Sequence, residues 1–400
     1  MSAPTNAGVP DPAGAPGNGQ HPNLLCLAER LVGHLGAGTL EMAPDESTLP
    51  VSHYSSDERL ARERATLFRR YPIAIGHASE LETPGTCIRH DALGVPLILV
   101  QGEDGPRCFL NVCRHRGMRV VSEEGACRRK AFVCPYHGWT YGLDGTLVHV
   151  PHAEAFPDLR PEAHGLVAVP LESRHGLLWV RPTPGEPLAL DEFLGPIAED
   201  LDAFALADHV LYRRIDTVRR ANWKLVIDAF LEAYHIRVLH RETIYRFFLD
   251  ARAVSDFVGP HVRSVAARRA AAALAGTPPA TWDLREDFTF THFVFPNSVF
   301  IFHPDYVSHI AVFPVDVDHV RWVHAMLVPR ALADRRAHWD RTLALIEETV
   351  FQREDLFAAE GIQAGLRSGA NDTVTFGRLE FALRHFHQTI ERALAGHTGQ

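Results

Sequence analysis

Two short segments, each carrying one cysteine and one histidine, constrain the fold of this chain more than any other feature. They read Cys-Arg-His-Arg-Gly-Met at 113–118 and Cys-Pro-Tyr-His-Gly-Trp at 134–139. In each segment a glycine follows the histidine, and glycine lets a loop turn tightly. Each loop therefore offers one thiolate and one imidazole, and we expect the two loops to face each other around a metal centre.

The donor set predicts a particular kind of centre. A [2Fe–2S] cluster with two thiolates on one iron and two imidazoles on the other needs this inventory, and its neutral imidazoles raise the reduction potential to about −150 to +300 mV. A structural zinc site also uses two Cys and two His. Zinc ligands, however, are usually paired on a small knuckle, whereas Cys-x-His combined with Cys-x-x-His in a β-rich segment favours the cluster.

The sequence around these loops is typical of an antiparallel β domain. Two hairpin signals, Asp104-Gly105 and Asp144-Gly145, stand beside runs rich in β-branched and aromatic residues. The predicted strands lie at 96–101, 107–112, 140–150 and 177–181.

A second candidate metal site lies in the stretch 222–240, which begins with a helical pattern. Its polar residues Asp228, Glu232 and His235 share one face of an ideal helix. His240 lies about 140° away from His235 on such a helix, so both reach one metal only if the helix ends or loosens between them. A bend is therefore predicted here.

Two histidines and one carboxylate on one face of an iron leave adjacent positions open for dioxygen and substrate. The segment 351–356 offers Glu354 and Asp355 as candidate carboxylates. Because the chain has 24 histidines, a lone pair would be read as helix-end or core histidines. The ordered pattern downstream of the Cys/His loops favours His235 and His240 as ligands.

The two ligand segments resemble those of Rieske non-haem iron oxygenases, in particular the α (catalytic) subunits of the aromatic-ring-hydroxylating dioxygenase family. The loops at 113–118 and 134–139 are similar to the Rieske motif, and 222–240 is similar to the mononuclear-iron segment. Respiratory Rieske proteins carry an extra, disulfide-bonded cysteine in each loop. Met118 and Tyr136 stand at those positions, which places the chain on the oxygenase and ferredoxin branch.

The resemblance implies a role for each candidate residue. The cluster ligands would be Cys113, His115, Cys134 and His137, and the mononuclear-iron ligands would be His235, His240 and Asp355, the last in preference to Glu354.

Glu232 stands where many family members have an aspartate that links two subunits. The resemblance implies that it bridges His137, a cluster ligand of one subunit, to an iron ligand of the next, and so carries electrons between subunits. Glutamate at this position is found in members that act on quaternary amines, though not only there. Asp228, on the same helix face, is expected to support the iron site.

The resemblance covers about residues 72–390 and implies an α+β fold. A small all-β Rieske domain precedes a helix-grip domain, in which an antiparallel sheet wraps a long helix. The predicted organisation is a disordered tail at 1–22, a helical segment at 23–71 that packs on the catalytic domain, the Rieske domain at 72–185 and the catalytic domain at 186–400. Within the last, helical texture is read at 190–206, 223–239, 264–275, 331–366 and 377–394, and strands at 288–295, 298–303, 307–313 and 319–328.

The expected function is O2-dependent oxidation of an aromatic or other apolar small molecule, by mono- or dioxygenation. The aromatic residues of 288–328 could line an apolar cavity. The first alternative is an oxidative N- or O-demethylase, including one for quaternary amines, because the same aromatic residues could form a cage for a cation. A weaker alternative is a Rieske electron carrier without oxygenase activity.

Electrons must come from outside the chain, since the sequence has no GxGxxG, P-loop or flavin signature. The expected partners are a ferredoxin, a flavin reductase or both, with NADH or NADPH used only through the reductase. A basic dock for the donor could be formed by Arg114, Arg116, Arg119, Arg128, Arg129 and Lys130. The resemblance also implies a head-to-tail homotrimer in preference to an assembly with a second kind of subunit.

Composition excludes several other classes. A net charge of −9 argues against a nucleic-acid or membrane-surface protein. No apolar run is long enough for a membrane span and no signal peptide is evident, so a cytoplasmic location is expected. Six cysteines in 400 residues are too few for a disulfide scaffold. The other cysteines, Cys26, Cys87, Cys108 and Cys127, are expected to be ordinary packing residues.

Overall fold

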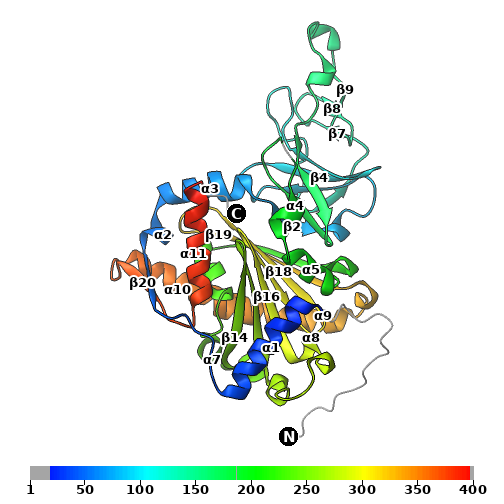
Figure 1. Ribbon diagram of the computed structural model, residues 1–400. Coiled ribbons are helices and arrows are strands. Elements are labelled where there is room, and N and C mark those ends of the chain that lie inside the picture. The colour runs from blue at the N-terminus through cyan, green and yellow to red at the C-terminus, as the bar shows by residue number, and fades with distance from the viewer. Residues whose placement is uncertain (1–18, 186, 397–400) are drawn as a thin grey trace.

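Antiparallel sheets organise the chain in the computed structural model, which describes residues 19–185 and 187–396 (Figure 1). The predicted tail lies mostly outside these described residues. The α-helices are α1 (Pro22–Ala37), α2 (Ser52–Ser55), α3 (Asp57–Arg70), α4 (Leu190–Leu194), α5 (Ile197–Ala203), α6 (Trp223–Phe230), α7 (Ile236–Leu239), α8 (Leu284–Asp287), α9 (Arg336–Leu343), α10 (Leu356–Arg367) and α11 (Phe381–Leu394). None of the described helices is long and apolar enough to span a bilayer.

The first half of the chain forms short strands in three sheets, with orders β10-β5-β4-β3-β6, β7-β8-β9 and β11-β12-β2. Their bounds are β2 (Ile73–His77), β3 (Thr86–His90), β4 (Leu97–Gly102), β5 (Gly105–Leu110), β6 (Ala126–Arg128), β7 (Phe132–Val133), β8 (Thr140–Tyr141), β9 (Leu147–His149), β10 (Ala168–Val169), β11 (Leu171–Arg174) and β12 (Leu177–Val180). Both predicted hairpins are present, since Asp104-Gly105 lies at the turn from β4 into β5 and Asp144-Gly145 lies in the loop between β8 and β9. The two Cys/His loops follow β5 and β7.

A seven-stranded antiparallel sheet, of order β13-β19-β18-β17-β16-β15-β14, forms the centre of the second half. Its strands are β13 (His209–Arg219), β14 (Phe248–Val258), β15 (His261–Arg268), β16 (Phe288–Val294), β17 (Ser298–Phe302), β18 (Val307–Pro314) and β19 (Val320–Pro329). A separate ribbon pairs β1 (Ser47–Pro50) with β20 (Thr373–Phe376). The α+β expectation is confirmed.

The large sheet is buried on both faces, because alternate side chains of its strands belong to two cores. On β16, Phe288 and Phe290 pack in the core that contains residues of α1, such as Leu27. Phe293, on the opposite face, packs in the core of α6 and α11, and its ring lies 5.1 Å from that of Phe386. Figure 1 shows α1 lying across the lower part of the sheet and α11 standing beside it.

A buried ion pair anchors the start of α6, the helix that leads into the candidate iron site. Asn222 caps the helix by accepting a hydrogen bond from the Lys224 backbone N–H, at 3.1 Å. Lys224 Nζ lies 2.8 Å from both carboxylate oxygens of Glu63 on α3, and Trp223 Nε1 donates to the same carboxylate at 2.9 Å. Since all three side chains are buried, this contact fixes α6 against the N-terminal helices.

The prediction of helix for 264–275 is wrong. Residues up to Arg268 belong to β15, and a 3-10 turn, Arg269–Ala273, follows. Alanine and arginine favour helix by propensity, but β15 pairs with β14 on one side and β16 on the other. Two ladders of backbone hydrogen bonds outweigh that weak local preference.

Two other helix predictions need correction in their details. The helix predicted for 223–239 ends at Phe230, and a single turn, α7, follows it. The helix predicted for 331–366 contains a π-helical segment, Ala344–Asp355, between α9 and α10. Such widened turns often mark functional sites.

Candidate metal centres

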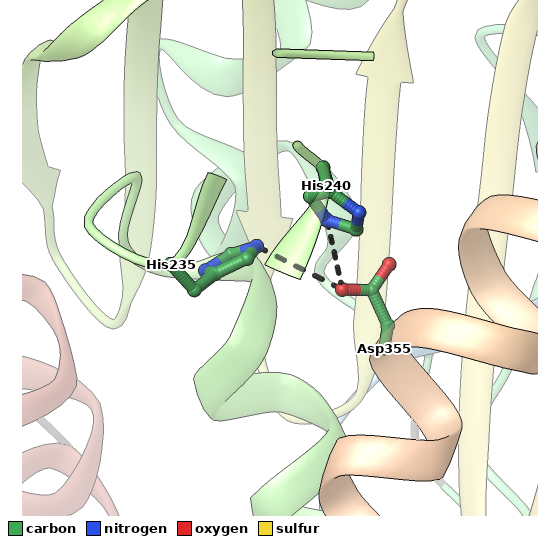
Figure 2. A group of neighbouring side chains, drawn as sticks. All are labelled: His235, His240 and Asp355. Carbon is green, nitrogen blue, oxygen red and sulfur yellow. Dashed lines mark ion pairs between the residues drawn. The ribbon is translucent and has the colours of Figure 1, made fainter. Parts of the chain in front are cut away.

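The predicted iron ligands come together from two distant segments (Figure 2). His235 and His240 flank the single turn α7, and Asp355 is the last residue of the π-helical segment. Asp355 Oδ1 lies 3.1 Å from His240 Nε2 and 3.7 Å from His235 Nε2. One ligand atom from each residue lies within 4.8 Å of the others, which is a separation that one metal ion can bridge.

Two further carboxylates contact the Nδ1 atoms of His235 and His240, the ring nitrogens that do not face Asp355. Glu232 contacts His235 Nδ1, and Glu354 lies 2.8 Å from His240 Nδ1. Thr243 in turn donates its hydroxyl to Glu354 at 2.8 Å. A carboxylate on Nδ1 fixes the tautomer with the proton there, so each Nε2 presents a lone pair toward Asp355.

The arrangement fits a cation. Asp355 Oδ1 is buried and accepts no well-formed hydrogen bond from the described residues, although two imidazole Nε2 atoms face it. The lone pairs of the two Nε2 atoms and of Asp355 Oδ1 therefore converge on one position, and none of these atoms carries a proton. Two histidines and one carboxylate are the donor set of non-haem Fe(II) sites.

The same electrostatics govern the histidines when no metal is bound. Burial lowers the pKa of His235, but Glu232 and then Asp355 more than offset this, so the net pKa is raised. At His240, burial also lowers the pKa, and Asp355 and Glu354 raise it overall. The pocket therefore stabilises positive charge, which a divalent ion would supply.

Glu232 also determines where the helix breaks. Its carboxylate accepts hydrogen bonds from the backbone N–H of Tyr234 and of His235, the latter at 3.1 Å. These bonds replace the helical ladder after Phe230. The predicted end of helix between the two histidines is present, because α7 ends at Leu239, and a further break after Phe230 lies before His235.

Asp228 is not part of the ligand group. Its carboxylate accepts a hydrogen bond from the Tyr54 hydroxyl at 2.7 Å and lies 3.0 Å from His387 Nε2. Because α6 ends at Phe230, Asp228 and His235 no longer share a helix face. The structure places Asp228 in the packing between α2, α6 and α11. By contrast, the role of Glu354 behind His240 was missed, although its position beside Asp355 was visible in the sequence.

Replacing Glu354 with glutamine is expected to weaken iron binding about 10- to 100-fold, since partners behind a metal-bound histidine typically contribute that much. Iron retained against a ferrous chelator measures the effect. Glu348→Gln, at an exposed position of the same helix, is the control. Equal retention by the two variants would contradict the role of Glu354.

The two Cys/His loops have matching backbone geometry. The backbone N–H of Cys113 donates to the carbonyl of Met118 at 2.7 Å, and that of Cys134 donates to the carbonyl of Trp139 at 2.8 Å. Gly117 and Gly138 have φ of 81° and 73°, the left-handed conformation that favours glycine. The glycine after each histidine therefore allows the tight turn that the sequence predicted.

The side chains of these loops fit a cluster that is buried on its sulfur side. Cys113 and Cys134 are buried, whereas His137 is exposed and His115 is half-buried. The Nδ1 atoms of the two histidines lie 3.1 Å apart, so both imidazoles point to one place. Burial, opposed by two backbone hydrogen bonds and reinforced by Cys113, raises the pKa of the Cys134 thiol. Two buried thiols and two more accessible imidazoles are the donors that a Rieske cluster requires.

The basic residues around the loops are only partly available for a partner. Arg119 pairs with Asp91 at 3.2 Å, and Arg129 pairs with Glu123. Arg128 and Lys130 are exposed and have no ion pair with a described residue. Arg114 and Arg116 are also exposed and pair with no carboxylate of a described residue, so a basic dock would depend on these four residues.

A cavity of about 290 Å³ opens beside the iron ligands. Aromatic residues line much of it. Polar residues lie among them where adjacent strands of the large sheet begin or end. The aromatic lining residues are Phe230, Phe247, Phe248, Tyr306 and Phe351, and the polar ones include Arg268, Thr289, His303 and Asp305.

Two family models match the chain. A model described as Rieske [2Fe-2S] domain matches residues 71–167, and one described as ring hydroxylating alpha subunit (catalytic domain) matches residues 206–396. The matches cover the two candidate centres, one each.

Curated relatives act on quaternary amines according to their names. The oxygenase subunit of carnitine monooxygenase from Escherichia coli K12 is 32% identical over 200 residues, which are 49% of this chain and 53% of the relative. The chain thus spans about half the length of that relative. Choline monooxygenase from Spinacia oleracea is 24% identical over 88% of this chain and 79% of its own length.

Solved structures show the same fold. A quaternary ammonium Rieske monooxygenase bound to an inhibitor superimposes with a TM-score of 0.74 at 22% identity, over 88% of this chain and 96% of the other. Naphthalene 1,2-dioxygenase from Rhodococcus sp. superimposes with a TM-score of 0.74 at 19% identity, over 95% of this chain and 100% of the other. At these identities the likeness concerns architecture alone.

Proposed function

The chain belongs to the α subunits of Rieske non-haem iron oxygenases, and on that premise we propose that it oxidises a small quaternary amine with molecular oxygen. One Rieske [2Fe-2S] cluster and one mononuclear iron are the cofactors of this family. The earlier expectation of an aromatic substrate has weaker support, because the curated relatives named above are monooxygenases of carnitine and choline.

The observation that carries the proposal is the cavity at the iron ligands. Its volume of about 290 Å³ is at the lower end of small-molecule sites, which range over about 300–1,000 Å³. A cavity of that size suits a small organic substrate. The lining also includes Phe230 and Phe351, and aromatic rings of this kind bind quaternary ammonium groups.

The residues of the chain supply ligation, orientation and exclusion of water. His235, His240 and Asp355 would hold the iron on one face, so the opposite positions remain for oxygen and substrate. Iron, when bound, supplies the activation of O2, and the cluster supplies electrons one at a time. Glu232 and Glu354 keep both imidazoles in the metal-binding tautomer, and the apolar lining keeps bulk water from the reacting atoms.

The two centres of one chain lie at opposite ends of the molecule. Figure 1 shows the small sheet β7-β8-β9, which carries one cluster loop, at the top and α7 near the bottom. We therefore propose a head-to-tail homotrimer in which the Glu232 region meets His137 of the partner subunit.

Apolar side chains are exposed at both ends of this predicted contact. Tyr234 and Val238, beside the iron ligands, are 63% and 80% exposed, and Tyr136, in a cluster loop, is 54% exposed. Large exposed apolar groups are commonly buried in interfaces. The side chain of Glu232 is 10% exposed, so it lies close to this surface. Electrons would reach the cluster from an external ferredoxin or flavin reductase, near Arg128 and Lys130.

The test is turnover with purified oxygenase and a reconstituted reductase. Choline, glycine betaine, carnitine and naphthalene are supplied separately, and O2 uptake is compared with product formed. We expect at least one quaternary amine to give one product per O2 consumed and naphthalene to give none. Oxidation of naphthalene without oxidation of any amine would overturn the proposal.

A further inference from the structure

An arginine lies in the cavity beside the candidate iron site. Arg268 is the last residue of β15, where the sheet edge also brings Thr289 of β16 and Asp305 of the β17–β18 turn. All three line the cavity with the ligands His235 and Asp355. The cavity is proposed to bind a cationic substrate, so the presence of a cationic side chain in it needs an explanation.

The guanidinium of Arg268 has no carboxylate partner. No carboxylate of the described residues lies within 4.0 Å of it, and the hydroxyl of Thr289, at 3.5 Å, is the nearest polar contact. The guanidinium lies over the rings of Phe247 and Phe248, 5.6 and 5.8 Å from their centroids. These rings orient the side chain but cannot neutralise its charge.

The nearby acids are separated from Arg268 or already engaged. Asp305 lines the cavity, but its Oδ2 lies 2.7 Å from Nε2 of His338, a residue outside the lining. Glu286 and Asp305 oppose the lowering of the Arg268 pKa by burial, but that lowering prevails. A partly buried arginine without an ion pair suits a planar anion, because its forked N–H groups match the two oxygens of a carboxylate.

We infer that Arg268 binds the carboxylate of the substrate, and that the quaternary amine taken by this chain is therefore a zwitterion. The inference rests on the proposed function and narrows it. A substrate bearing only positive charge would be repelled by Arg268. A zwitterion places its carboxylate on the guanidinium, which leaves the ammonium group to the aromatic rings and to the negative side of the site near Glu232.

The experiment uses a pair of quaternary amines that differ in this one group. Glycine betaine carries a carboxylate where choline carries a hydroxymethyl group. Both are tested with the holoenzyme, Arg268→Met and Arg268→Lys. Arg269→Met is the matched control, because Arg269 is adjacent, exposed and absent from the cavity lining.

We expect the wild-type enzyme to prefer glycine betaine, and Arg268→Met to lose about 10- to 100-fold in kcat/KM for it, chiefly through KM, as expected for a lost charge-assisted hydrogen bond. Activity on choline should not fall, and Arg268→Lys should recover part of the loss. Protection against thermal unfolding by glycine betaine, lost in Arg268→Met, gives a readout independent of turnover. An unchanged cluster spectrum verifies folding.

The possible failures are distinguishable. If choline is the better substrate and Arg268→Met leaves both amines unaffected, the inference is overturned while the proposed function stands. If no quaternary amine is oxidised and naphthalene is, both are overturned.

Discussion

His235→Ala is expected to abolish oxygenation while the visible spectrum of the Rieske cluster stays unchanged. The variant removes one of three converging ligand atoms and leaves Asp355 Oδ1 facing a single imidazole. The cluster ligands belong to other loops and do not contact this site. Iron should fall from about three to about two atoms per chain, since a Rieske cluster holds two and the facial site holds one. Metal analysis and O2 uptake check the two results.

The control for this variant is His149→Ala, which removes an exposed histidine of β9. It should keep about three irons and full activity. A His235→Ala protein that still oxidises substrate would remove His235 from the ligand set. A wild-type protein that holds two irons per chain would instead support the electron-carrier alternative.

Glu232→Gln, supplied with excess ferrous ion because the loss of the carboxylate behind His235 also weakens iron binding, is expected to stop electrons from passing between subunits. The glutamine keeps the size of the side chain and can still accept hydrogen bonds from the backbone of Tyr234 and His235. It removes the negative charge between His235 and the proposed contact, His137 of the partner subunit. Turnover should therefore fall below detection.

Single-turnover spectroscopy separates this effect from a structural one. In the wild-type enzyme, a chemically reduced cluster should be reoxidised when substrate and O2 are added. In Glu232→Gln, reconstituted to the same iron content as the wild type, it should stay reduced over the same time. Glu232→Asp, the residue that many family members have, should restore reoxidation at least in part. Reoxidation of Glu232→Gln at the wild-type rate would show that electrons take another route.

Much of the candidate site was predictable because many of its residues lie close together in short segments of the sequence. Each Cys/His loop has its ligands and its glycine within six residues, so local sequence carries both the donor atoms and the turn. The hairpins at Asp104-Gly105 and Asp144-Gly145 are predictable for the same reason. The choice of Asp355 over Glu354 came from a family resemblance, and the structure adds why both acids stand there. One faces the metal position and the other holds His240.

What failed depends on contacts between distant parts of the chain. Arg268 was hidden in a stretch of Ala and Arg that favours helix locally, and only its pairing with β14 and β16 makes it the end of a strand. Asp228 seemed to share a face with His235 because an ideal helix was assumed. The side chain of Glu232 ends that helix early, through bonds to the backbone that helical periodicity does not reveal.

The wide separation of the iron ligands along the chain has a consequence for biosynthesis. Glu354 lies 114 residues after His240, and Asp355 follows it. A nascent polypeptide that has left the ribosome only as far as β19 presents two imidazoles but no carboxylate to complete the trio. Metal affinity arises together with the folded site. Ferrous ion can therefore bind only after the large sheet has been synthesised, and oxygen is not activated on an incomplete chain.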